Sequence, residues 1–181
     1  MKTFMKILVL SLLIFSFSHG AEYDKSLLKA HAKLIPKIML LDQSLKDKLI
    51  DGKVKILIAA ESKDEQSAQM IAQYIRDIYK SKLLKYPLEI VFQDAQKLDM
   101  NVPASAVYLL SLPKNEMKKV LDYIDKKGVI SFVYNLDGLN QGALISIRLE
   151  TKTTIYFNRS SWNSGTIKFR PGFFKIVKSY E

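Results

Sequence analysis

The chain has 181 residues, of which 28 are lysine or arginine and 18 are aspartate or glutamate, giving a formal net charge of +10. It has no cysteine, and 48% of its residues are hydrophobic. Disulfides are therefore excluded, and one globular domain held together by packing alone is expected.

The first twenty residues have the pattern of a secretory signal peptide. Lys2 and Lys6 give a basic start, and residues 7–17 form an uncharged apolar run. Ser18 and Gly20 place small residues at positions −3 and −1 before Ala21. The apolar run is shorter than the roughly 20 residues that span a bilayer. We therefore expect 1–20 to be removed and 21–181 to be an exported, periplasmic domain with no transmembrane segment.

The predicted signal peptide contains two of the lysines and no acidic residue, which leaves 26 basic and 18 acidic residues and a net charge of +8. A positive balance favours anionic partners. An exported protein does not meet nucleic acid in its normal location. Anionic lipid, wall polymer or an acidic protein surface are the partners this charge suggests.

Helices and strands are predicted to alternate through the first two thirds of the chain. Residues 24–41 have helical spacing, interrupted by Pro36, which should kink or split the helix. Residues 53–60 form an apolar run typical of a strand covered on both faces. Ser62 and Glu65 match a capping box for a helix that continues to about residue 82.

The next elements continue the alternation. Residues 88–92 and 106–110 are apolar runs of strand length, and a helix capped by Asn115 should end near Gly128. This order predicts a sheet with helices against both faces.

The last third changes to a strand-rich pattern. We expect a strand over 129–134, a turn at 135–138, strands over 143–150 and 153–158 joined as a hairpin, and a short closing helix after residue 172. The predicted fold is thus a single three-layer α/β domain over 21–181, with a mixed sheet, helices on both faces and an antiparallel C-terminal hairpin.

The sequence offers little for catalysis. His31 is the only histidine after residue 20, and it falls on the apolar side of the first predicted helix, where we expect a buried ring with one hydrogen bond. A pH-sensing role is the alternative for this ring. Ser26 with Lys29 and Ser111 with Lys114 match Ser-x-x-Lys but lack the companion motifs of penicillin-binding enzymes. No catalytic residue, metal site or cofactor is predicted.

Positive charge gathers near the C-terminus. Between residues 143 and 178 there are seven basic residues and one acidic residue. The simplest explanation is a solvated face that keeps the protein soluble. The functional alternative is a contact face for an acidic partner, because Trp, Tyr and Arg dominate interface energies. We predict that Arg148, Tyr156, Trp162 and Lys168 contribute to partner binding. Trp162 could instead fold back as a core anchor beneath its loop.

The C-terminal third resembles the end of YfiR-like periplasmic proteins. The resemblance rests on Gln141-Gly142-Ala143-Leu144-Ile145, on Ile155-Tyr156-Phe157-Asn158, and on Phe173-Phe174-Lys175-Ile176-Val177. In that family the corresponding patterns are a Gly-Gly-x-Ile turn and strand, a Phe-x-Ile-Asn strand and a final helix with a Leu-Leu pair. The family's cysteines and the Trp-Pro that often follows its first helix have no counterpart here.

The resemblance implies a periplasmic, non-enzymatic regulator, often a homodimer, that represses the periplasmic sensor domain of an inner-membrane diguanylate cyclase and so controls cyclic di-GMP and biofilm growth. The alternative is a small solute-binding module serving a transporter or a sensor kinase. Its ligand would lie beyond the strand ends, near Glu61, Ser62 and Ser111.

Overall fold

The computed structural model describes residues 23–99 and 101–181. The predicted signal peptide, residues 1–20, lies outside these ranges. No helix within them is long and apolar enough to cross a membrane.

One eight-stranded sheet runs through the domain, in the order β2-β3-β1-β4-β5-β6-β7-β8. Neighbours from β3 through β6 are parallel, β6 and β7 form an antiparallel hairpin, and β8 returns parallel to β7. The short β2 is antiparallel to β3. The strands are β1 (Val54–Ala60), β2 (Lys82–Leu83), β3 (Tyr86–Asp94), β4 (Ala106–Leu109), β5 (Ile130–Val133), β6 (Ile145–Leu149), β7 (Thr153–Asn158) and β8 (Val177–Tyr180).

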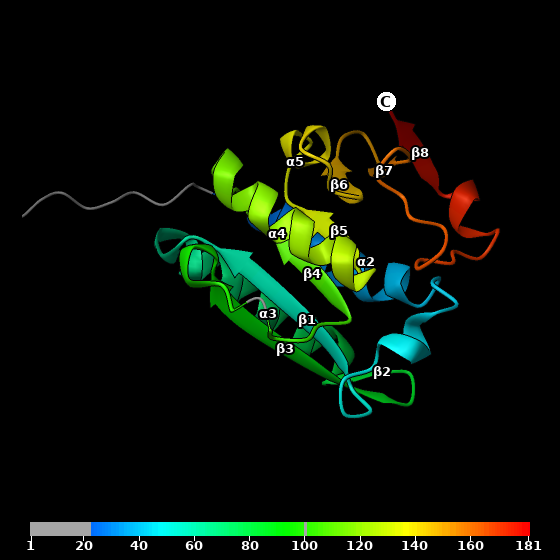
Figure 1. Cartoon of the computed structure of the whole chain (residues 1–181), viewed down its shortest axis with the longest axis horizontal. Helices are drawn as coiled ribbons and strands as arrows, with labels where there is room; N and C mark the ends of the chain where they lie inside the picture. The colour runs from blue at the N-terminus through cyan, green and yellow to red at the C-terminus, as the bar shows by residue number, and fades with distance from the viewer. Residues whose placement is uncertain (1–22, 100) are drawn as a thin grey trace, which may run out of the picture.

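Helices cover both faces of this sheet. The α-helices are α2 (Lys25–Met39), α3 (Glu65–Tyr79), α4 (Lys114–Lys127) and the short α5 (Asp137–Asn140). Helices α2 and α3 pack together on one face, and α4 lies across the other (Figure 1). Short 3-10 turns are η1 (Leu45–Lys48), η2 (Ser62–Asp64), η3 (Ala95–Lys97) and η4 (Phe173–Lys175). The predicted three-layer fold with a mixed sheet and an antiparallel hairpin is confirmed.

The central strands explain why the layers hold together. In β1, Ile56 and Ile58 point into the core beneath α2 and α3, whereas Leu57 and Ala59 point into the core beneath α4. All four are fully buried. Side chains alternate across a strand, so one continuous apolar run supplies both cores.

Three helix details differ from the prediction. Helix α2 continues through Pro36 without splitting, with Asp24 as the N-cap that accepts a hydrogen bond from Leu27 N. The capping box at Ser62 is wrong, because η2 comes first and the Ser62 hydroxyl bonds Asp94 instead. Helix α4 begins at Lys114, so Asn115 lies inside its first turn.

The second half shows two further differences. The predicted turn at 135–138 runs into α5, and the Asn135 side chain accepts a hydrogen bond from Gly138 N. The predicted closing helix is only the turn η4, after which the chain forms strand β8. Pairing with β7 outweighs helix formation there, because Val177 and Tyr180 each lie against β7 partners.

Gly128 ends α4 in the left-handed conformation, with φ of 60°. A Cβ added there would come within 2.6 Å of the Thr166 Cβ. The end of α4 and the loop before β8 therefore approach each other so closely that only glycine fits.

We expect Gly128→Ala to lower the free energy of unfolding by roughly 2–4 kcal/mol. The alanine would incur both the cost of the left-handed backbone conformation and the cost of the clash with Thr166. Gly52→Ala is the matched control, because Gly52 has φ of 73° but nothing within 4 Å of the added Cβ. Its loss should be about 1–2 kcal/mol. Urea denaturation of both variants measures the difference, and equal losses would show that Thr166 does not constrain Gly128.

Candidate functional site

The carboxyl end of the sheet contains the position where open α/β sheets usually bind ligands. Strand β1 lies between β3 and β4, so the chain leaves it first toward one side of the sheet and later toward the other. Ligands in such folds occupy the crevice beyond the strand ends at this reversal of strand order. Here the crevice would lie between the end of β1 at Ala60 and the end of β4 near Leu110.

The side chain of Tyr23 fills this position. Its hydroxyl donates to Asp64 Oδ2 at 3.0 Å and accepts from Ser111 N at 3.2 Å. The ring stands edge-on to Tyr134, with centroids 4.7 Å apart. Tyr23 is only 7% exposed. The residue before the α2 cap therefore bridges the two strand ends that a ligand would otherwise contact.

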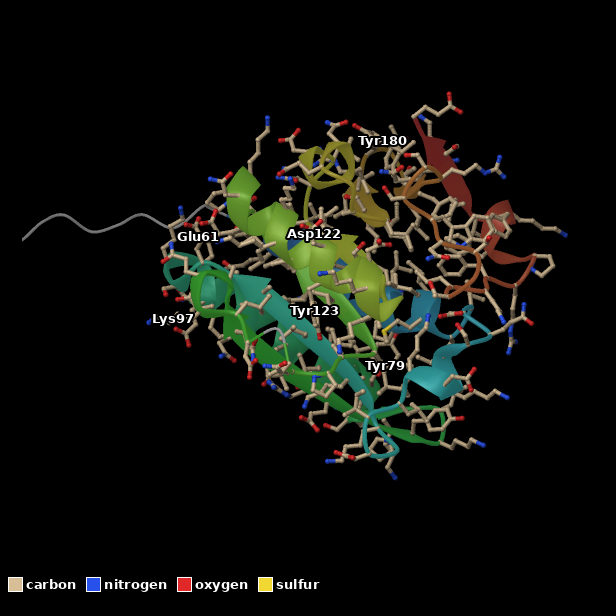
Figure 2. All side chains as sticks on the ribbon, in the orientation of Figure 1. Glu61, Tyr79, Lys97, Asp122, Tyr123 and Tyr180 are labelled. Atoms are coloured by element: carbon tan, nitrogen blue, oxygen red, sulfur yellow. The ribbon has the colours of Figure 1, made fainter. Side chains whose placement is uncertain are left out.

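The polar residues expected at the crevice are engaged elsewhere. Glu61 forms an ion pair with Lys63 at 2.7 Å, and the Ser62 hydroxyl donates to Asp94 Oδ2 at 2.5 Å. Ser111 Oγ accepts from the Asn135 side-chain amide. Figure 2 shows Glu61 and Lys97 at the same end of the molecule.

A buried aromatic cluster lies beneath Tyr23. His31 is fully buried, with Nε2 2.8 Å from the Ile147 carbonyl oxygen and its ring 5.5 Å from that of Tyr108. The expectation of a buried histidine with one hydrogen bond is confirmed. His31 Nδ1 and the Tyr108 hydroxyl have no hydrogen-bond partner among residues 23–99 and 101–181. This cluster is a sealed interior, and its one imidazole lies out of contact with solvent.

Burial controls the ionisation of this cluster. Burial lowers the pKa of His31 to about 4, opposed by its bond to Ile147 and assisted by the charge of Arg148. Burial also raises the pKa of the Tyr23 and Tyr108 phenols. All three groups are thus neutral near pH 7, which suits packing and not proton transfer.

The predicted partner-binding residues do not lie together. Tyr156 projects from β7 into the core beneath α4, is 8% exposed, and donates a hydrogen bond to Glu150 Oε1. Arg148 extends from β6 on that same side of the sheet, since its register partner Thr154 lies two residues before Tyr156 on β7, and is half-buried.

Trp162 packs on the opposite side of the sheet, within a group of phenylalanines. Its ring lies 5.8 Å from Phe157 and 5.3 Å from Phe174, and its Nε1 donates to the Ile167 carbonyl at 2.8 Å. This is the arrangement of a core anchor beneath a loop, the second of the two alternatives for Trp162. Lys168 is exposed, and its backbone N–H donates to Asp42.

Two structural features were missed by sequence reasoning. Tyr23 lies three residues after the end of the predicted signal peptide and belongs to no motif, so its place in the crevice could not be anticipated. Asp42 lies in the polar segment between the first predicted helix and the strand predicted at 53–60, where an exposed side chain would be expected. It is nevertheless only 3% exposed and accepts hydrogen bonds from Ser44, Lys48 and Lys168. Within the ranges the structure describes, no group of three or more acidic or histidine side chains could hold a metal ion.

Comparisons with known proteins agree on the fold. No family model matches this chain, and no curated protein matches it significantly in sequence. A conserved domain protein from Vibrio cholerae has a TM-score of 0.56 with 9% identity, over 85% of this chain and 60% of that one. An ABC domain from Streptococcus pneumonia, solved in complex with L-Trp, has a TM-score of 0.50 with 8% identity, over 78% of this chain and 61% of that one. The chain thus spans about three fifths of each neighbour.

We expect Trp162→Ala to lower the free energy of unfolding by roughly 2–3 kcal/mol, because a half-buried ring and its hydrogen bond are lost. Trp162→Phe should lose less, since the aromatic packing is retained. Thermal melts of both variants provide the test. An unchanged Tm in Trp162→Ala together with lost partner binding would instead assign this ring to a contact surface.

The pKa of His31 predicts acid sensitivity. A folded-state value of about 4, below the ordinary 6.5, means that the unfolded chain binds the proton more tightly. Stability is therefore full above pH 6.5 and declines as the pH falls toward 4. The contribution of His31 should be about 2 kcal/mol smaller at pH 5 than at pH 7.

Urea denaturation at the two pH values, compared between the native chain and His31→Gln, measures this contribution. The glutamine amide can still donate toward Ile147 but does not titrate. We expect the native chain to lose more stability between pH 7 and pH 5 than the variant. Equal losses in both proteins would show that His31 does not couple folding to pH.

Proposed function

We propose that this protein is a periplasmic, non-enzymatic regulator that binds and represses the sensor domain of an inner-membrane signalling protein such as a diguanylate cyclase. The proposal joins the secretory pattern of residues 1–20, the resemblance of the C-terminal third to YfiR-like proteins, and the three-layer α/β fold. The chain would act by binding, and the chemistry would belong to its target.

The occupied crevice is the observation that carries this proposal. Tyr23 places its ring and hydroxyl between Asp64 and Ser111, where a small-molecule ligand of this fold type would sit. A solute-binding module needs that space to be open. A protein that acts through its outer surface does not need an open crevice.

The exposed basic side chains of the C-terminal segment also support the proposal. Basic side chains exposed in the C-terminal segment include Lys168, Arg170, Lys175 and Lys178. These cations would attract an acidic surface of a partner protein. At physiological salt the attraction is screened beyond a Debye length of about 8 Å. Regulation would then follow from population shift, because a protein that binds the inactive state of its target more tightly favours that state.

The second candidate is a solute-binding module. It is favoured by the likeness to an ABC domain that was solved with L-Trp bound. For this chain to bind a similar ligand, Tyr23 would have to leave the crevice and break its bonds to Asp64 and Ser111.

Deletion of the gene in the native host tests the proposal, with cyclic di-GMP measured before and after and again after the gene is restored. We expect the nucleotide level to rise on deletion and to return on restoration. In parallel, the tagged chain should retain a diguanylate cyclase from detergent-solubilised inner membranes.

Thermal melts of the purified chain with L-Trp and other amino acids test the second candidate. We expect no specific rise in Tm. A saturable rise with one ligand, combined with an unchanged cyclic di-GMP level after deletion, would reject the regulator and favour solute binding.

A further inference from the structure

A groove opens at the amino end of the sheet, away from the crevice that Tyr23 fills. Its volume is about 570 Å³, within the range of pockets that bind ligands. We call it the basal groove. It is lined by the end of α2 and the segment after it, by η1, by the β2–β3 hairpin and by the C-terminal segment: Leu40, Leu41, Asp42, Gln43, Leu45, Lys46, Leu84, Lys85, Tyr86 and Arg170.

Leu84 is the most unusual residue of the basal groove. It is 74% exposed, more than any other large apolar side chain among the described residues. Its φ is 55°, in the left-handed region that leucine disfavours. The fold thus holds a strained leucine out in water, where it gains little from burial. Such strain commonly accompanies a functional position.

The exposed charges in the lining of the groove are all positive. Lys46, Lys85 and Arg170 are exposed, and none of them forms an ion pair with any residue in the ranges 23–99 and 101–181. The one carboxylate in the lining, Asp42, is buried and already accepts bonds from Ser44 and Lys48. The groove therefore presents three uncompensated cations around an apolar floor.

We propose that the basal groove binds an acidic protein segment that carries an apolar side chain between carboxylates. The apolar side chain would contact Leu84 and Leu41, and the carboxylates would pair with Lys85 and Arg170. This inference rests on the proposed function and gives the regulator its contact surface.

The shape of the groove favours a peptide over a membrane as the occupant. In the lining, Leu84 is largely exposed, whereas Leu41 is half-buried and Leu45 is buried. A flat bilayer would meet mainly Leu84, whereas a peptide side chain can enter the groove and contact the less exposed leucines as well. Charge complementarity with three cations then selects an acidic sequence.

Fluorescence anisotropy tests the proposal with a labelled synthetic peptide in which glutamates flank a single leucine. The purified chain should bind this peptide, and binding should weaken as salt is raised. Peptides with glutamine in place of the leucine, or lysines in place of the glutamates, should bind at least several-fold more weakly. Equal binding of all three peptides would overturn the proposal.

Two groove variants and two matched controls assign the binding to this surface. The double variant Lys85→Glu with Arg170→Glu should bind about tenfold more weakly, because two exposed ion pairs become repulsive. Leu84→Asn should bind about fivefold more weakly. The controls, Ile176→Asn and Lys126→Glu with Lys127→Glu, change an exposed apolar residue and two exposed lysines outside the groove, and should bind normally.

Leu84→Asn carries a second readout that separates binding from folding. Asparagine tolerates the left-handed conformation better than leucine does. Its Tm should therefore equal or exceed that of the native chain while peptide affinity falls. A lowered Tm with unchanged affinity would show that Leu84 is structural, and the proposal would fail.

The remaining outcomes distinguish the groove from the proposed function. If groove variants still retain the membrane partner and still restore the cyclic di-GMP level, the regulator stands and the basal groove is not its contact surface. If the peptide binds but no membrane partner or change in cyclic di-GMP is found, the proposed regulatory function is rejected and the binding of an acidic segment in the basal groove is supported. Binding to phosphatidylglycerol vesicles without binding to the peptide would overturn the groove in favour of a lipid surface.

Discussion

The buried carboxylate of Asp42 joins the segment after α2 to the segment around Lys168. It accepts hydrogen bonds from Ser44, from Lys48 Nζ at 2.7 Å and from Lys168 N at 2.9 Å. Burial alone would raise the pKa of Asp42, but the bonds from Lys48 and Ser44 bring it below its usual range. Removing a partner of such a buried charge typically costs 3–5 kcal/mol. The charged carboxylate therefore adds to the backbone hydrogen bonds from Gln43 N to the Lys168 carbonyl and from Arg170 N to the Leu41 carbonyl, which also join the two segments. Both segments contribute to the lining of the basal groove.

The opposite end of the sheet is closed by neutral groups. Tyr23 packs edge-on to Tyr134, whose ring lies beside that of His31. Burial lowers the pKa of His31 and raises the pKa of the Tyr23 and Tyr108 phenols, so these three groups are neutral near pH 7. The carboxyl end thus resembles a hydrophobic core with a few internal hydrogen bonds, whereas the amino end is open and cationic. In many α/β proteins the carboxyl end is the binding end. Here the exposed cations and the exposed leucine of the basal groove lie at the amino end of the sheet.

The sequence predicted the elements that depend on local apolar spacing, and it failed where a contact between residues distant in sequence determines the structure. Strands such as 53–60 and helices such as α3 were predictable, because their apolar spacing reflects burial by any neighbour. The Ser62 capping box failed because Asp94, distant in sequence, takes its hydroxyl. Strand β8 was missed because the segment from Phe173 onward also has a spacing that fits a helix. The pairing of residues 177–180 with β7, which is distant in sequence, makes this segment a strand. At the site, alternation placed Tyr156 correctly on the face opposite Phe157. It could not show that α4 and Tyr180 cover that face, nor that Tyr23 closes the crevice.

Helix α2 connects the two ends. Its fifteen residues span about 22 Å, from the Asp24 cap beside Tyr134 to the Leu40–Asp42 segment of the groove. Midway, His31 bonds the Ile147 carbonyl of β6 and fixes the helix against the sheet. A proton on His31 would place an uncompensated charge in this interior, so the packing of α2 against the sheet disfavours the protonated ring. Helix α2 contributes to both ends of the sheet, because Tyr23 precedes its cap at the closed crevice and Leu40 and Leu41 follow it in the lining of the basal groove.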